Sequence, residues 1–179
     1  MIPGQAPRAV PPSGPTPLPA RRGWRALAWS FVYAWDGVVD TAARQRNMRI
    51  HLAAAGAVCL LASAAPLSLA SDLALLLCIF LVLAAEVANS ALEALVDLVT
   101  RDRHELARRA KDAGAGAVLV LACASVAVFA AVVVREAPAL RRASLAAVRP
   151  AWLLPLAGVA VVALAASRRA RRASPPDGP

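Results

Sequence analysis

The sequence predicts an all-α membrane protein, with an N-terminal amphipathic surface helix, three transmembrane helices and a C-terminal segment that could add a fourth. Hydrophobic residues make up 59% of the 179 residues and charged residues only 17%. The cations lie in blocks between long apolar runs, and none falls from Leu52 to Leu98. This alternation is typical of membrane topology. It argues against a disordered chain, and it indicates that the net charge of +9 does not form a nucleic-acid-binding face.

The N-terminal part divides into two segments. Residues 1–22 are rich in proline and poor in large apolar groups, which predicts a disordered tail. Over residues 23–50, apolar side chains recur at steps of three and four, as expected for an amphipathic helix. It carries Trp24, Trp29 and Trp35, and indole rings prefer the headgroup level. We therefore expect it on the cytoplasmic membrane surface; packing on a soluble core is the alternative.

Three apolar runs, 52–70, 73–99 and 113–134, form the predicted core of residues 51–134. At ~1.5 Å per helical residue, each is long enough to cross a hydrocarbon layer of ~30 Å. The segment before the first run and the loop 101–111 are rich in arginine, whereas the turn 66–72 has no cation. The positive-inside rule then predicts a multi-pass membrane protein in which the N-terminus and the loop 101–111 are cytoplasmic.

Residues 135–179 form an arginine-rich extension. Its apolar run, 151–166, is short for a span and contains Pro155, so it either crosses the membrane or lies at the interface. Crossing would leave the arginines of 135–149 outside, against the charge rule, whereas the arginines of 168–172 favour a cytoplasmic end. We interpret this run as a fourth helix.

The second apolar run is interrupted by Glu86, Asn89, Glu93 and Asp97. At ~100° per residue they share an arc of about 80° on one helix face. A charged carboxylate near the bilayer centre costs at least ~2.5 kcal/mol, so such groups usually have a function. Three interpretations are open: a polar stripe that fixes oligomer register, a path for protons or cations, and a catalytic site. Carboxylates one or two turns apart also suit Mg²⁺.

The following loop supplies the opposite charge. The only lysine among 20 cationic residues, Lys111, lies here, and a compact ammonium is a good phosphate binder. A helix expected to begin near Ala113 would point free N–H groups at an anion in this place. The alternative is a basic loop that only sets topology, with Asp112 as the helix N-cap.

These residues carry a family resemblance. The run Glu86-Val-Ala-Asn89-Ser90-Ala-Leu-Glu93-Ala-Leu-Val-Asp97, followed by His104-Glu-Leu and Arg109-Ala-Lys111-Asp112, resembles the signature of the prokaryotic diacylglycerol kinase family. These are small integral-membrane lipid kinases that include undecaprenol kinases. Upstream, Tyr33-Ala-Trp35-Asp-Gly37 and Arg46-Asn47-Met48-Arg49-Ile50-His51 resemble the family's surface helix and its junction to the first span. The resemblance covers about residues 25–134.

The resemblance implies a homotrimer that phosphorylates a membrane lipid with ATP and Mg²⁺, converting diacylglycerol to phosphatidic acid, with undecaprenol as the alternative lipid. Its sites would lie at the membrane–cytoplasm boundary, between neighbouring subunits. Position by position, the implied roles are these: Glu86 as general base with Asn89 orienting the lipid hydroxyl; Glu93 and Gln45 at the metal; Lys111, Asp112, Asp102, Arg103, His104 and Tyr33 at the nucleotide; and Asp97, Asn47 and Ser90 in support.

The sequence departs from the family pattern in two places. Gln45 stands where the family has a second metal carboxylate, and a neutral amide is a weaker ligand, so that metal affinity is lower or Asp40 assists. The extension 135–179 has no counterpart in the pattern. A rival class is a small oligomeric membrane protein without ATP turnover, whose acidic stripe conducts ions or fixes assembly.

Overall fold

The computed structural model describes residues 23–144 and 148–173, so the tail predicted to be disordered lies outside the described residues. The elements in chain order are α1 (Trp24–Arg44), α2 (Arg46–Ala64), α3 (Leu69–Val99), α4 (Glu105–Arg135), the short α5 (Ala137–Leu140), the 3₁₀ turn η1 (Pro150–Trp152) and α6 (Leu153–Ala173). The described part contains helices and no strand, which confirms the all-α prediction.

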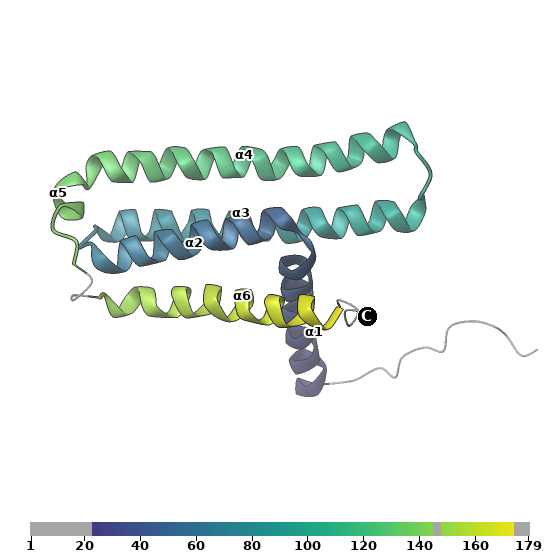
Figure 1. Cartoon of the computed structure of the whole chain (residues 1–179), viewed down its shortest axis with the longest axis horizontal. Coiled ribbons are helices and arrows are strands. Elements are labelled where there is room, and N and C mark those ends of the chain that lie inside the picture. The colour runs from purple at the N-terminus through teal and green to yellow at the C-terminus, as the bar shows by residue number, and fades with distance from the viewer. Residues whose placement is uncertain (1–22, 145–147, 174–179) are drawn as a thin grey trace, which may run out of the picture.

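Helices α2, α3, α4 and α6 run along one another as a bundle, and α1 lies across it beside the start of α2 and the end of α6, while α3 and α4 extend past α1 to their connecting loop (Figure 1). The segments 46–64, 69–99, 105–135 and 150–172 are each long and apolar enough to cross a membrane. The chain is therefore a multi-pass membrane protein, and the fourth C-terminal helix is present. We call the end of the bundle that carries α1 the α1 end.

The surface helix is shorter than the predicted segment 23–50. It ends at Arg44 because Gln45 has an extended conformation, with φ −88° and ψ 121°, and α2 begins directly after it. The helix of the first span ends at Ala64, just before the predicted turn 66–72, so the last residues of the apolar run 52–70 fall in that turn and in the start of α3. Ala65 is extended because the ring of Pro66 disfavours a helical residue before it.

The expected start of the third span near Ala113 is wrong, and so is Asp112 as its N-cap. Helix α4 begins at Glu105, and the N-cap is His104, whose Nδ1 accepts a hydrogen bond from the backbone N–H of Leu106 at 3.2 Å. The apolar pattern starts later because the first two turns are charged. Ion pairs at helical spacing, such as Arg108 with Asp112, stabilise these turns outside the apolar layer.

Each end of the bundle has its own buried cluster. At the α1 end, Ala42, Met48, Leu52 and Ala166 join α1, α2 and α6. At the opposite end, a larger cluster joins α2, α3, α4 and the extension around Trp152, which is 1% exposed. The polar stripe of α3 lies toward the α1 end, so the cluster around Ala42 and Met48 holds together the helices next to the stripe.

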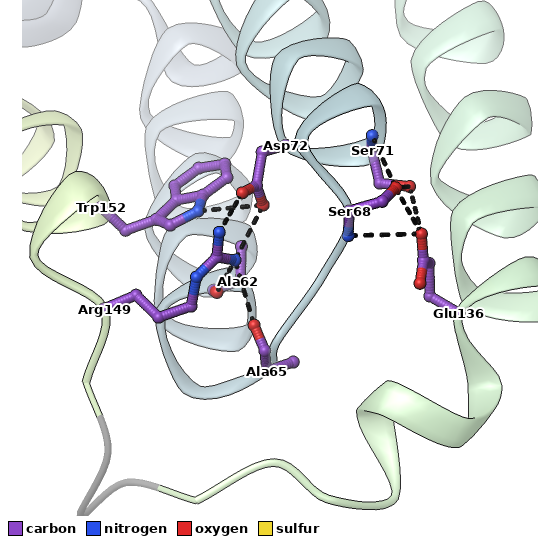
Figure 2. Close-up of polar contacts among 8 residues, drawn as sticks. All are labelled: Ala62, Ala65, Ser68, Ser71, Asp72, Glu136, Arg149 and Trp152. Atoms are coloured by element: carbon purple, nitrogen blue, oxygen red, sulfur yellow. Dashed lines mark hydrogen bonds and ion pairs between the residues drawn. The ribbon is translucent and has the colours of Figure 1, made fainter.

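Helices α3 and α4 are also joined by hydrogen bonds at the end opposite α1. The hydroxyls of Ser68 and Ser71 donate to Oε1 of Glu136 at 2.6 and 2.8 Å (Figure 2). These bonds hold the pKa of Glu136 below its usual range because they stabilise its charged form. Ser68 is also the N-cap of α3, so one side chain both starts the second span and ties it to the end of the third.

Candidate functional site

Glu86 is the most deeply buried acid of the site. It is 2% exposed, and its Oε1 lies 3.3 Å from Nε2 of His51 on α2, within ion-pair distance. That oxygen nevertheless makes no hydrogen bond within the described part of the chain. A carboxylate held in a membrane-spanning helix with one oxygen free of donors is suited to accept a proton from a substrate.

Glu93, two turns along α3, is held by two amides. Gln45 donates from Nε2 to Oε2 at 2.9 Å, and Asn89 donates from Nδ2 to Oε1 at 3.0 Å. Gln45 reaches Glu93 because it stands at the break between α1 and α2. The structure thus brings three predicted site residues into direct contact.

Two of these residues, Glu93 and Gln45, fit a metal that is shared with a substrate. No group of three or more His, Cys, Asp or Glu residues within the described ranges could hold a metal by itself. The carboxylate of Glu93 and the amide carbonyl of Gln45 supply two adjacent oxygen donors. That number suits Mg²⁺, which usually takes one or two protein ligands and completes its shell with phosphate oxygens and water.

Asn89 is fixed from its other side by α4. A Cβ placed on Gly114 would overlap Oδ1 of Asn89 and lie 2.8 Å from Cδ2 of Leu92, so only glycine permits this approach of the two helices. The Oδ1 atom of Asn89 and the hydroxyl of Ser90 are buried without a hydrogen bond among the described residues. Close packing of Oδ1 against Gly114 therefore fixes the position of Asn89, whose Nδ2 faces Glu93.

A polar cavity of about 450 Å³ lies between the end of α3 and the start of α4. Lys111 reaches into it and pairs with Asp97, with Nζ 2.5 Å from Oδ1. Four of the predicted nucleotide contacts line it: Asp102, Arg103, His104 and Lys111. Asp97 is eleven residues beyond Glu86, about 16 Å along the helix axis, so Glu86, Glu93 and the basic cavity follow one another along one face of α3.

Three predicted residues lie elsewhere. Asp112 faces outward and pairs with Arg108, with Nη1 and Oδ2 2.6 Å apart. Tyr33 is 63% exposed on α1, with its ring beside that of Trp29 at a centroid distance of 6.0 Å. Asn47 is exposed in the first turn of α2. No hydrogen bond or ion pair found in the described ranges links these three to Glu86 or Glu93.

An apolar groove of about 400 Å³ begins beside His51, the neighbour of Glu86. Helices α2, α3 and α4 form its walls, with Val58, Ile79, Val82 and Phe129 among the lining residues. His51 was missed as a site residue by the sequence prediction. The available signal was that it is one of only two histidines and precedes the first apolar run.

Comparison with known proteins agrees with this geometry. Residues 32–133 match the family model of prokaryotic diacylglycerol kinase. The chain is 44% identical over 126 residues to a diacylglycerol kinase of Synechocystis sp., covering 65% of this chain and 70% of that protein. It is 43% identical over 96 residues to the undecaprenol kinase of Bacillus subtilis, covering 54% and 78%. It is also 33% identical over 103 residues to a diacylglycerol kinase of Escherichia coli, covering 55% and 80%.

The fold and the site together define an integral-membrane lipid kinase. The matched segment exceeds half of the 179 residues, and the chain belongs to the prokaryotic diacylglycerol kinase family. The match ends at residue 133, so α5, η1 and α6 lie beyond it.

Proposed function

We propose that the chain transfers the γ-phosphoryl group of ATP to the hydroxyl of diacylglycerol and releases phosphatidic acid at the α1 end of the bundle. The observation that carries the proposal is the buried Glu86 carboxylate. Its neighbour His51, 3.3 Å away, lines the apolar groove, so a lipid with its tail in the groove would bring its headgroup close to Glu86.

Glu86 acts as the general base in this proposal. Its unbonded Oε1 takes the proton from the lipid hydroxyl as that oxygen attacks the γ-phosphorus, and His51 is close enough to stabilise the carboxylate between turnovers. Asn89 orients the hydroxyl by donating the second proton of Nδ2 to its oxygen, since the first is donated to Glu93. These tasks are positioning and charge neutralisation, which are the main protein contributions in phosphoryl transfer.

Glu93 and the carbonyl of Gln45 would hold Mg²⁺, and the basic cavity would hold the nucleotide. When bound, Mg²⁺ neutralises charge on the β- and γ-phosphates. Lys111 exchanges its contact with Asp97 for a phosphate oxygen, and Arg103 and His104 line the same cavity. Tyr33, Asn47 and Asp112 join the site only if α1 or a neighbouring subunit moves toward it.

Undecaprenol is the second candidate acceptor. The observation in its favour is the similarity to the undecaprenol kinase of Bacillus subtilis, which nearly equals the similarity to the diacylglycerol kinase of Synechocystis sp.. The groove is apolar along its length, so it suits an isoprenoid chain as well as an acyl chain.

We further infer a homotrimer in the bacterial inner membrane with α1 on the cytoplasmic side. The orientation is supported by the arginines at the α1 end, including Arg46, Arg49 and Arg101. Assembly is supported by large apolar side chains near the polar cavity, since Leu98 and Val99 are 83% and 78% exposed. A second copy would cover them. Chemical crosslinking in native membranes that yields only monomers would contradict the trimer.

The experiment is a lipid kinase assay on the purified full-length protein with Mg-ATP and, separately, diacylglycerol and undecaprenol. We expect Glu86→Gln to lower kcat by at least ~10²-fold, because a general base contributes about that much or more. Glu136→Gln, the same change at the opposite end, should leave kcat within about twofold. No phosphorylated product from either lipid, or full activity of Glu86→Gln, would refute the proposal.

The rival reading as an ion path is less well supported. Glu93 accepts two amide hydrogen bonds and Asp97 pairs with Lys111. Glu86 lies beside His51 instead. The three acids thus have different surroundings, which favours separate roles over a row of equivalent sites for ions.

A further inference from the structure

The extension beyond residue 133 is anchored to the core at the end opposite α1. Arg149 forms a two-pronged ion pair with Asp72 and also donates from Nη1 to the carbonyls of Ala62 and Ala65, at 3.3 and 3.1 Å (Figure 2). Trp152 donates from Nε1 to Oδ1 of Asp72 at 3.2 Å. The side chain of Asp72 is 9% exposed, and its carboxylate contacts all come from the extension.

The extension is attached to the core a second time, at the α1 end. Arg169 lies 3.5 Å from a carboxylate oxygen of Asp36 and 3.3 Å from one of Asp40, both on α1. One turn earlier, Ala166 is 4% exposed in the cluster with Ala42 and Met48. Helix α6 therefore runs from the first attachment to the second and ends in contact with the surface helix, as Figure 1 also shows.

This second attachment lies at the corner that carries Gln45. Ala42 is the last buried residue of α1, Met48 is the first buried residue of α2, and Gln45 stands at the break between them. Ala42 and Met48 are fully buried under Ala166 and its neighbours. A displacement of α6 would loosen this corner, and the Gln45 amide would lose its fixed position against Glu93.

We propose that α6 is a positioning element of the kinase site: the fourth span holds the α1–α2 corner so that Gln45 stays in contact with Glu93. The inference rests on the proposed function, since it assigns a role to α6 in the metal and nucleotide end of that site. It gives the extension a function in catalysis, although none of its residues touches the substrates.

The kinetic test compares two identical substitutions on α6. Ala166→Leu forces a larger side chain into the buried corner, whereas Ala160→Leu adds the same group at an exposed position of the same helix. We expect Ala166→Leu to raise KM for Mg-ATP about three- to tenfold with a smaller change in kcat, and Ala160→Leu to leave both within about twofold. Equal kinetics for the two variants would overturn the proposal.

A second readout does not depend on activity. In a variant with Cys59, Cys78 and Cys123 replaced, the pair Gln45→Cys/Glu93→Cys is treated with a short thiol-to-thiol crosslinker. The crosslinking rate should fall at least threefold when Ala166→Leu is added and stay unchanged when Ala160→Leu is added. If the protein phosphorylated no lipid at all, the proposed function would fail, and this measurement would still decide whether α6 positions the corner. Equal rates in both backgrounds would refute the positioning role.

A milder pair covers the case in which Ala166→Leu does not fold. Arg169→Gln removes the ion pairs with α1, Arg169→Lys keeps the charge, and Arg171→Gln changes an exposed arginine two residues away. Because the pairs are exposed, we expect Arg169→Gln to slow crosslinking only about two- to fivefold. Arg169→Lys should restore at least half of the lost rate. Equal crosslinking rates in the Arg169→Gln and Arg171→Gln backgrounds would contradict the proposal.

Discussion

The neutral amide at the metal end of the site leads to a quantitative prediction. Replacing Gln45 with glutamate should lower the Mg²⁺ concentration at half-maximal activity by at least tenfold. In the structure the Gln45 amide donates to Glu93 at 2.9 Å, and a hydrogen bond to a charged group is worth about 1.5–3 kcal/mol. In the proposed site metal binding breaks this bond, because the same carboxylate oxygens would be the metal ligands.

Gln45→Glu reverses the sign of that contact. Two carboxylates about 3 Å apart repel by roughly 1.4 kcal/mol in water and by about 5.5 kcal/mol at an effective dielectric of 20. A bound cation removes this repulsion, which makes the free energy of metal binding more favourable in the variant. In the native chain, metal binding instead costs the free energy of the hydrogen bond between Gln45 and Glu93. Each ~1.4 kcal/mol is tenfold in affinity, so tenfold is the lower limit.

The assay is a Mg²⁺ titration of lipid kinase activity at saturating ATP. Ser30→Glu, on an exposed face of α1, controls for the added charge and should leave the Mg²⁺ dependence within about twofold. Gln45→Leu has no ligand oxygen and should shift the midpoint to higher Mg²⁺. An unchanged or raised midpoint for Gln45→Glu would refute the assignment of Gln45 and Glu93 as the metal ligands.

Two other substitutions have expected outcomes of a different kind. Gly114→Ala should lower kcat in the lipid kinase assay at least tenfold, because the new Cβ displaces Asn89. Gly116→Ala has open space at its Cβ position, and its kcat should stay within about twofold of the native value. Equal kcat values for the two variants would contradict the role of Asn89. Arg149→Ala should destabilise the protein by about 3–5 kcal/mol, because it leaves the Asp72 carboxylate buried without its partner. Its thermal unfolding midpoint in detergent should fall further than that of the double variant Asp72→Asn/Arg149→Gln. A double variant less stable than Arg149→Ala would contradict the importance of the buried ion pair.

The residues of the polar stripe could be predicted from the sequence because helical periodicity acts over short distances. Glu86, Asn89 and Glu93 share a face of α3 whatever surrounds them. The partner of Asp97 could not be found in this way. Arg101, four residues along the chain, was the local candidate, but α3 ends at Val99, and the structure pairs Asp97 with Lys111 across the α3–α4 loop.

Element ends were predicted less well, since hydropathy reports the apolar layer and not the helix. Helix α4 begins at Glu105, eight residues before the apolar run, because ion pairs stabilise its charged turns. The role of the extension was also beyond the sequence. The pairing of Asp72 with Arg149 joins residues 77 apart, and no local pattern indicates it.

The neutral side chain at position 45 and the packing of α6 are physically linked through the α1–α2 corner. In a site with two carboxylates at the metal position, the bound cation itself draws the α1–α2 corner toward α3, and the corner is pushed away when the cation leaves. With Gln45, the corner keeps a hydrogen bond to Glu93 in the absence of metal, but the cation attracts it less strongly. The position of the corner then depends more on the protein's own packing. The buried contact of Ala166 with Ala42 and Met48 supplies such packing, and it comes from the part of the chain that lies beyond the family match.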